Sequence, residues 1–246
     1  MVTRTRSDRP AFYALAPGGW RDYVTLIHLP YTTWHLSYVV IGACLAPHVP
    51  AGRLALTVVA FFLGLGLGAH ALDELNGRPL NTRIPTAVLV SLAAGSLAGA
   101  SAIGIAVAVA HDLWLLAFVA FGAFIACAYN LELFGGRFHN GFWLATAWGA
   151  FPVLTAYFAM ADRITGEAVL TALYAALLIR AQQTLSTPVR DVRRRTVSVT
   201  GTIERTDGSR LPIDPEMLTG PPETALRFMA AASVALAAAL LVLRYL

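Results

Sequence analysis

The densest group of chemically active side chains in this sequence lies in residues 70–85, directly after a long apolar and glycine-rich run. His70, Asp73 and Glu74 stand at positions i, i+3 and i+4, and would share one face of a continuing helix. The two carboxylates are suitable ligands for a divalent cation, and the imidazole suits a softer metal. Charge at the end of a membrane helix is costly unless it is solvated or paired, so it usually marks a site. We therefore predict a polar site at one face of a membrane.

Composition predicts the elements that must position these residues. Hydrophobic residues make up 57% of the 246-residue chain and charged residues 13%. Several apolar stretches are long enough to cross about 30 Å of hydrocarbon. We predict an all-α, polytopic membrane bundle of about seven transmembrane helices. The expected spans are residues 30–48, 54–74, 85–110, 113–131, 141–161, 165–185 and 223–243.

The expected domain organisation is simple. Residues 1–22 would form an N-terminal arm, and residues 23–246 a single transmembrane domain. Residues 196–213 alternate apolar and polar side chains around Asp207-Gly208, which is typical of a β-hairpin. We expect this hairpin to be a short cytoplasmic insertion between the sixth and seventh helices.

The arginines predict the orientation. Fifteen of the 18 fall in the N-terminal arm or near the loops after the second, fourth and sixth spans. The positive-inside rule assigns that face to the cytoplasm and the C-terminus to the outside. We expect an integral protein of a bacterial inner membrane, with attraction to anionic lipid and no case for nucleic acid. Alanine-rich spans would also permit a homo-oligomer.

Other polar residues are expected on the same cytoplasmic face. His28 and His35 are seven residues apart and would share a face of a continuous helix. The Gly135-Gly136 turn would let Glu132 and His139 face each other across a hairpin. Arg137 is a candidate anion clamp, and aromatic side chains in the fifth span could stabilise a carbocation. The arginines at 193–195 could hold a diphosphate, although for Arg194 and Arg195 we expect contact with anionic headgroups.

Short motifs in residues 21–195 resemble the UbiA superfamily of intramembrane prenyltransferases and terpenoid cyclases. They are Tyr23 to Trp34, Asp73 to Pro85 with Arg78-Pro79-Leu80, Tyr129-Asn130, and Trp148-Gly149. The resemblance implies a site at which Mg²⁺ and two aspartate-rich motifs hold an isoprenoid diphosphate. This chain departs from that pattern, since only Asp73 fits the first motif. Gln182 and Gln183 stand where the second motif would have acids, and Asp191 alone follows.

Three functions remain open from the sequence. The first is a shortened UbiA-like enzyme acting on an isoprenoid by prenyl transfer with Mg²⁺, or by a cyclisation that one protonated carboxyl group could start without metal. Its candidate catalytic residues are Asp73, Glu74, Glu132 and Asp191. Its candidate metal ligands are Asp73, Glu74, His70 and Asn76. Its candidate substrate-binding residues are Arg78, Arg137, Arg190, Tyr31, Trp34, Tyr129, Asn130, Trp148, Gln182 and Gln183.

The second function is a membrane enzyme dependent on iron or zinc, such as a lipid oxygenase or desaturase. It would add His28, His35, Glu132 and His139 to the metal ligands, because imidazole and carboxylate together form the ligand sets of such sites. The third is a non-catalytic lipid-binding subunit, which the missing second acidic motif favours.

Overall fold

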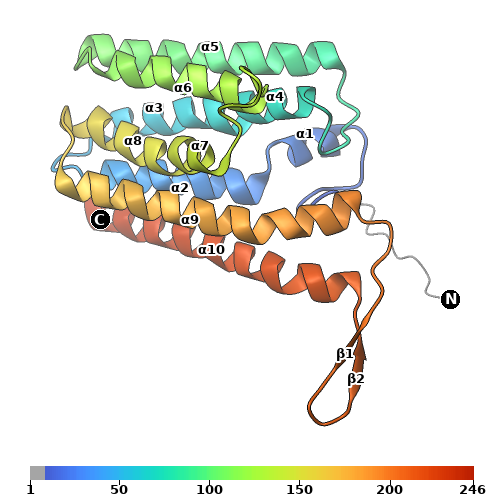
Figure 1. Ribbon diagram of the computed structural model, residues 1–246. Coiled ribbons are helices and arrows are strands. Elements are labelled where there is room, and N and C mark those ends of the chain that lie inside the picture. The colour runs from blue at the N-terminus through green and yellow to red at the C-terminus, as the bar shows by residue number, and fades with distance from the viewer. Residues whose placement is uncertain (1–8) are drawn as a thin grey trace.

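The computed structural model describes residues 9–246 as a bundle of helices with one small β-hairpin (Figure 1). The first eight residues of the expected N-terminal arm, including Arg4 and Arg6, lie outside the described residues. The chain begins with the short helix α1 (Trp20–Leu26) and continues with α2 (Leu29–Leu45). Between them Ile27 and His28 break the helix, and His28 adopts a left-handed conformation with φ 50°.

The next two helical rods pack on the same side of the bundle. The first consists of α3 (Ala51–Phe61), the π-helical segment η1 (Phe62–Ala69) and α4 (His70–Leu75). Residues 76–85 then form an irregular loop that leads into α5 (Thr86–Ala110), which packs against η1 and α4. Helix α6 (Leu115–Asn130) returns beside α5.

The second half of the chain closes the bundle. One rod of this half combines α7 (Gly141–Ala145), the π-helical η2 (Thr146–Ala150) and α8 (Phe151–Ala161). The next combines α9 (Gly166–Arg190) with the π-helical η3 (Asp191–Arg195). The final helix is α10 (Pro215–Tyr245), and α2 packs between α8 and α10. The C-terminus lies at the end of the bundle opposite the hairpin (Figure 1).

The predicted hairpin is present. Strands β1 (Thr202–Glu204) and β2 (Arg210–Pro212) pair in antiparallel register, with Ile203 opposite Leu211. The hairpin projects from the bundle between α9–η3 and α10 (Figure 1). The turn runs from Arg205 to Gly208, where the Gly208 amide donates to the Arg205 carbonyl at 2.9 Å and the Asp207 carboxylate accepts from the Ser209 amide at 2.9 Å. Gly208 has φ 81°, a left-handed conformation that ends a three-residue hairpin loop and that glycine adopts readily.

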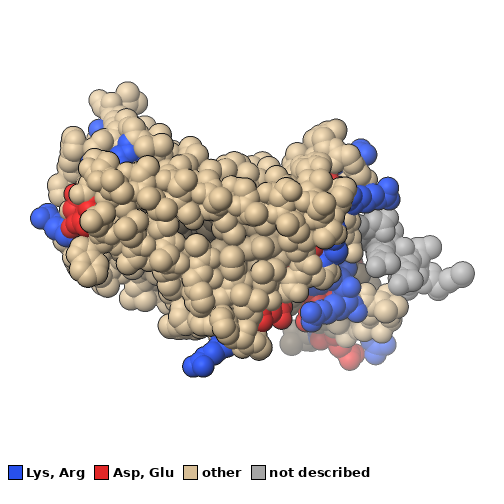
Figure 2. Space-filling view, turned by 90° about the horizontal axis from the view of Figure 1, so that it is seen from above, with Lys and Arg blue, Asp and Glu red and all other residues tan. Residues whose placement is uncertain are grey.

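The helices indicate an integral membrane protein. Within residues 9–246, five helical rods are long and apolar enough to cross a membrane. They are residues 51–75, 86–110, 141–161, 166–195 and 215–245. Of the seven expected spans, 30–48 falls on the 17-residue α2 and 113–131 on the 16-residue α6, both shorter than these five. Figure 2 shows most charged side chains towards the two ends of the molecule, with a broad uncharged band between them.

Close helix contacts depend on small residues. A Cβ added at Gly149 would lie 2.8 Å from the Ala175 carbonyl oxygen, and one added at Gly42 would lie 2.8 Å from the Val153 Cα. Such distances are possible only without a side chain, so these glycines set the approach of η2 to α9 and of α2 to α8. The packed centre contains the fully buried Trp34 and Tyr38.

Candidate functional site

A polar cavity of about 310 Å³ lies at the hairpin end of the bundle. Its wall combines the beginning of α2, the ends of α4 and α6, the beginning of α7–η2, the end of α9–η3 and the beginning of α10, together with residues 10–13. Twelve of the residues proposed from the sequence line it: Asp73, His28, His35, His70, Tyr31, Tyr129, Asn130, His139, Trp148, Gln182, Gln183 and Arg190.

Two neighbouring carboxylates of α4 have different environments. Asp73 lines the cavity, and its side chain forms no hydrogen bond or ion pair with residues 9–246. Glu74 is fully buried and faces the loop after α4 instead. Its Oε2 accepts a hydrogen bond from the Leu80 amide at 3.0 Å, and its Oε1 accepts from both the amide and the hydroxyl of Thr82 at 2.8 Å. The structure therefore separates the acidic pair, and Glu74 holds the loop rather than facing the cavity.

The remaining charged groups near this loop also stabilise its conformation. The Arg78 guanidinium donates to the Ile84 carbonyl at 2.6 Å and to the Thr86 hydroxyl at 2.9 Å, so it is used within the loop and does not line the cavity. Asp22 is buried, and its carboxylate accepts from the Gly18 and Arg83 amides at 2.9 Å. Buried carboxylates of this kind replace backbone partners that an irregular loop lacks.

Five further candidates also lie outside the cavity wall. Trp34 is fully buried in the core, while Glu132, Arg137 and Asp191 are exposed. Asn76 donates to the Asn130 carbonyl at 3.2 Å and joins α4 to the end of α6. Asp191 pairs with Arg195 at 3.5 Å on the surface.

Three of the four candidate histidines stack on other rings, and His70 and His139 also contact backbone carbonyl groups, whereas the buried Nδ1 of His35 has no hydrogen-bond partner among residues 9–246. The rings of His28 and His70 stack with 4.0 Å between centroids, and His70 Nδ1 lies 3.1 Å from the Gly66 carbonyl oxygen. His139 stacks on Tyr129 at 4.5 Å, and its Nδ1 lies 2.9 Å from the Tyr129 carbonyl oxygen. Burial, with His70 nearby, lowers the pKa of His28 well below its usual range, so this ring is neutral at pH 7.

The donor set does not fit a metal held by the protein. Within residues 9–246, no group of three or more His, Cys, Asp or Glu side chains is arranged to bind a metal ion. Mg²⁺ prefers hard oxygen ligands in octahedral geometry. The cavity wall has two carboxylates, Asp73 and Glu223, and Glu223 is already paired with Arg193 through contacts of 2.5 and 2.8 Å. Asp73 alone is then free to face a ligand.

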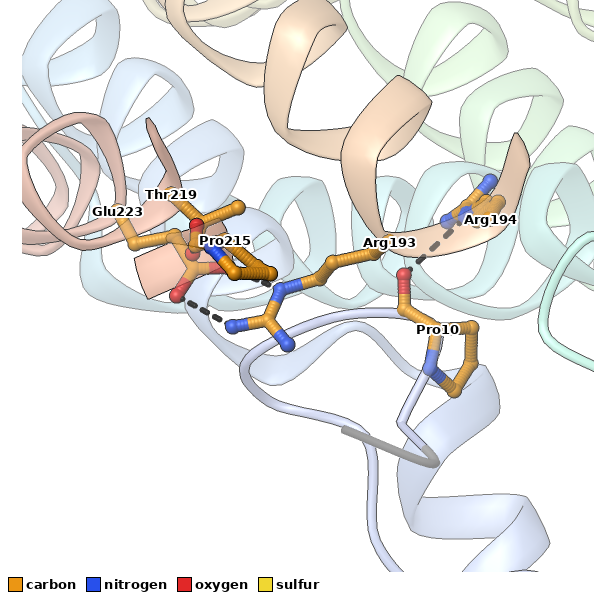
Figure 3. Close-up of polar contacts among 6 residues, drawn as sticks. All are labelled: Pro10, Arg193, Arg194, Pro215, Thr219 and Glu223. Atoms are coloured by element: carbon orange, nitrogen blue, oxygen red, sulfur yellow. Dashed lines mark hydrogen bonds and ion pairs between the residues drawn. The ribbon is translucent and has the colours of Figure 1, made fainter. Parts of the chain in front are cut away.

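Sequence reasoning predicted Arg190 but not Arg194 for the positively charged part of the cavity wall. Arg194, expected at lipid headgroups, lines the cavity together with Arg190. Its Nε donates to the Pro10 carbonyl at 3.1 Å, while the neighbouring Arg193 pairs with Glu223 of α10 (Figure 3). The Arg190 guanidinium donates to the Ser186 hydroxyl at 2.9 Å. Neither Arg190 nor Arg194 has a carboxylate of residues 9–246 within ion-pair distance, so both remain available to an anion.

Residues 10–13 of the N-terminal arm cover part of the cavity, a contact that was not expected from the sequence. Phe12 and Tyr13 line the wall, and the Tyr13 ring lies 5.1 Å from His28 and 5.5 Å from Tyr31 between centroids. Burial raises the pKa of the Tyr13 phenol, so the hydroxyl remains neutral and can donate a hydrogen bond. The only sequence signal was a pair of aromatic residues before the first span.

A second, apolar pocket of about 130 Å³ lies between α3–η1, α5, α6 and η2–α8. Trp148 lines both this pocket and the polar cavity, so its indole is part of the wall between them. The ring also lies 4.6 Å from Tyr129 between centroids. Charged side chains therefore line the cavity on one side of Trp148, and apolar side chains line the pocket on the other side.

Comparison with family models, with curated proteins and with solved structures finds no match for this chain. The resemblance to UbiA-type enzymes consequently rests on the short motifs quoted above.

Proposed function

We propose that this chain is an intramembrane enzyme that acts on an isoprenoid lipid with an anionic head. The observation that carries the proposal is the polar cavity, in which the unpartnered carboxylate of Asp73 faces the same space as Arg190 and Arg194. The arginines supply positive charge for a phosphate or diphosphate group. The adjoining apolar pocket beyond Trp148 suits a hydrocarbon chain.

Proton transfer is the chemistry that this wall supports best. A carboxyl group at Asp73 can protonate an epoxide or alkene of the isoprenoid, which gives a carbocation. The faces of Tyr129 and Trp148 stabilise positive charge nearby by cation–π attraction. The Asp73 carboxylate that remains then accepts the proton that the carbocation releases, so the carboxyl group is regenerated and the overall reaction is an isomerisation. This cyclisation requires no Mg²⁺ from the protein, whereas Mg²⁺-dependent prenyl transfer requires carboxylates that this cavity lacks.

We also propose that α2 and α6 cross the membrane together with the five longer rods. This gives seven spans with the polar cavity at the cytoplasmic face. The distribution of arginines supports this orientation, because most of them lie at the cavity end.

The test is to incubate the protein, purified in detergent, with prenyl diphosphates and their epoxides, with Mg²⁺ or with EDTA. Liquid chromatography with mass spectrometry should detect a product that has the mass of the substrate but elutes separately from it, formed in EDTA and abolished by Asp73→Asn. Arg194→Gln should raise KM, while the matched control Arg195→Gln should not, since Arg195 is exposed and outside the cavity wall. Release of diphosphate only with Mg²⁺ would favour prenyl transfer. Tight lipid binding without turnover would favour the lipid-binding subunit.

A further inference from the structure

The polar cavity reaches the surface of the molecule beside the loop between α6 and α7, residues 131–140. Among the described residues that line the cavity, His139 and Asn140 are exposed, and all the others are buried or half-buried. Both exposed residues belong to this one loop. The mouth of the cavity therefore lies at the α6–α7 loop.

The surface around this mouth carries large apolar side chains beside the exposed Glu132 and Arg137. Leu131, Leu133, Phe134 and Phe142 are 36%, 39%, 68% and 69% exposed, and we call these four residues the apolar edge. The Phe134 ring lies 6.2 Å from Phe124 between centroids, and Phe124 is itself exposed on α6. The apolar edge therefore continues the outer surface of an apolar helix.

Helix lengths place this loop within the membrane rather than beyond it. α5 has 25 residues and α6 has 16, so at a rise of 1.5 Å per residue α6 is about 13 Å shorter than α5. A four-residue connection, residues 111–114, joins the two helices, so they begin at a similar level at that end. Figure 1 shows α6 ending well short of the opposite end of α5. At about 24 Å, α6 is shorter than a hydrocarbon core of about 30 Å, so the loop that follows α6 completes the crossing and lies at the depth of the interface.

We propose that the apolar edge is immersed in the lipid interface and that the polar cavity opens there sideways to the bilayer. The occupant of this surface is the membrane itself. Exposed Phe and Leu side chains suit the boundary between headgroups and chains. Arg137 of the same loop is exposed and can extend to anionic headgroups. An amphipathic ligand then reaches the cavity from the bilayer without passing through water. Only the identity of that ligand rests on the proposed function.

The test uses spin labels on single cysteines in liposomes, in a Cys44→Ala/Cys127→Ala background. Labels at Phe134→Cys, Phe142→Cys and His139→Cys are compared for collision with oxygen, which concentrates in lipid, and with a water-soluble nickel chelate. Val90→Cys is the lipid control, since Val90 is 50% exposed in the first two turns of the apolar helix α5. Asp207→Cys, at the exposed tip of the hairpin, is the water control.

The expected result is that labels at 134, 142 and 139 resemble Val90→Cys, with a ratio of oxygen to nickel collisions several-fold above that of Asp207→Cys. Nickel collisions equal to those of Asp207→Cys would overturn the proposal, because the mouth would then face water. Low collision rates with both reagents would also overturn it, because another protein surface would cover the edge. This readout needs no turnover, so failure of the proposed enzymatic function leaves it intact.

Discussion

Glu74 provides the sharpest test of how the structure separates the two carboxylates at the end of the rod α3–η1–α4. Its carboxylate is fully buried and accepts three hydrogen bonds from Leu80 and Thr82, whereas the adjacent Asp73 has no such partners and lines the cavity. We expect substitutions at Glu74 to lower stability, and Asp73→Asn to leave stability unchanged while removing turnover.

The hydrogen bonds give the magnitude. Glu74→Gln keeps one acceptor oxygen and turns an amide NH₂ towards a backbone donor, which leaves a buried N–H unsatisfied at a cost of about 1–3 kcal/mol. Glu74→Ala removes the acceptors of two backbone N–H groups, so the cost is about 2–6 kcal/mol. Thr82→Val removes only the hydroxyl donor and leaves the carboxylate in place, so we expect about 0.5–1.5 kcal/mol.

Thermal and denaturant unfolding in detergent, followed by tryptophan fluorescence, measures this series. The expected order of stability is wild type and Asp73→Asn, then Thr82→Val, then Glu74→Gln, then Glu74→Ala. Wild-type stability of both Glu74 variants, together with loss of turnover, would refute the reasoning. It would mean that Glu74, like Asp73, acts on the ligand.

Three further predictions follow from contacts in the described residues. Glu223→Gln should destabilise the fold by about 3–5 kcal/mol, because it removes the negative charge that pairs with the half-buried Arg193 guanidinium; Arg193→Met/Glu223→Met should recover most of the loss in the same unfolding assay. Asn140→Ala should cost about 1 kcal/mol, because the Asn140 side chain caps two backbone N–H groups at the start of α7; Asn140→Asp should have an intermediate stability, because it keeps the capping oxygen but loses the hydrogen bond that Nδ2 donates to the Arg137 carbonyl at 3.0 Å. Gly149→Leu should disrupt packing of η2 on α9, because even a Cβ there would lie 2.8 Å from the Ala175 carbonyl; loss of monodisperse protein on gel filtration checks this, with Gly166→Leu, which has open space, as the control.

The larger elements were predictable from the sequence because apolar length and turn chemistry are local properties. Hydrophobic runs located the five long rods, and Asp207-Gly208 located the hairpin. The gathering of His28, His35 and Asp73 at one cavity was also expected, although the helix is broken at His28. These residues come together because they lie at the same end of the bundle, and the order of the helices along the chain is enough to predict that.

The individual roles of adjacent polar residues were not predictable. Asp73 and Glu74 are adjacent carboxylates on different sides of α4, and Glu74 accepts hydrogen bonds from an irregular loop whose conformation the sequence does not predict. Arg78 was expected to bind an anion, but it turns back onto carbonyl groups of its own loop. Arg194 was expected at headgroups, and the π-helical turn of η3 accompanies its placement at the cavity. These outcomes depend on contacts made by segments far apart in the sequence.

The π-helical segments have a consequence for how the chain tolerates insertions and deletions. A π-turn holds an additional residue, so side chains before and after η1 do not follow one 3.6-residue period. Removing one residue between Gly64 and Gly68 could restore α-helical hydrogen bonding and keep the segment apolar. Because the π-turn already accommodates the additional residue, this deletion would leave α4 in nearly the same orientation relative to α3. His70 and Asp73 would then still face the cavity, whereas deletion of Ala71 from the α-helical α4 would turn Asp73 by about 100° relative to His70. The glycine-rich turn is thus the place where this rod can lose a residue and keep the register of the site.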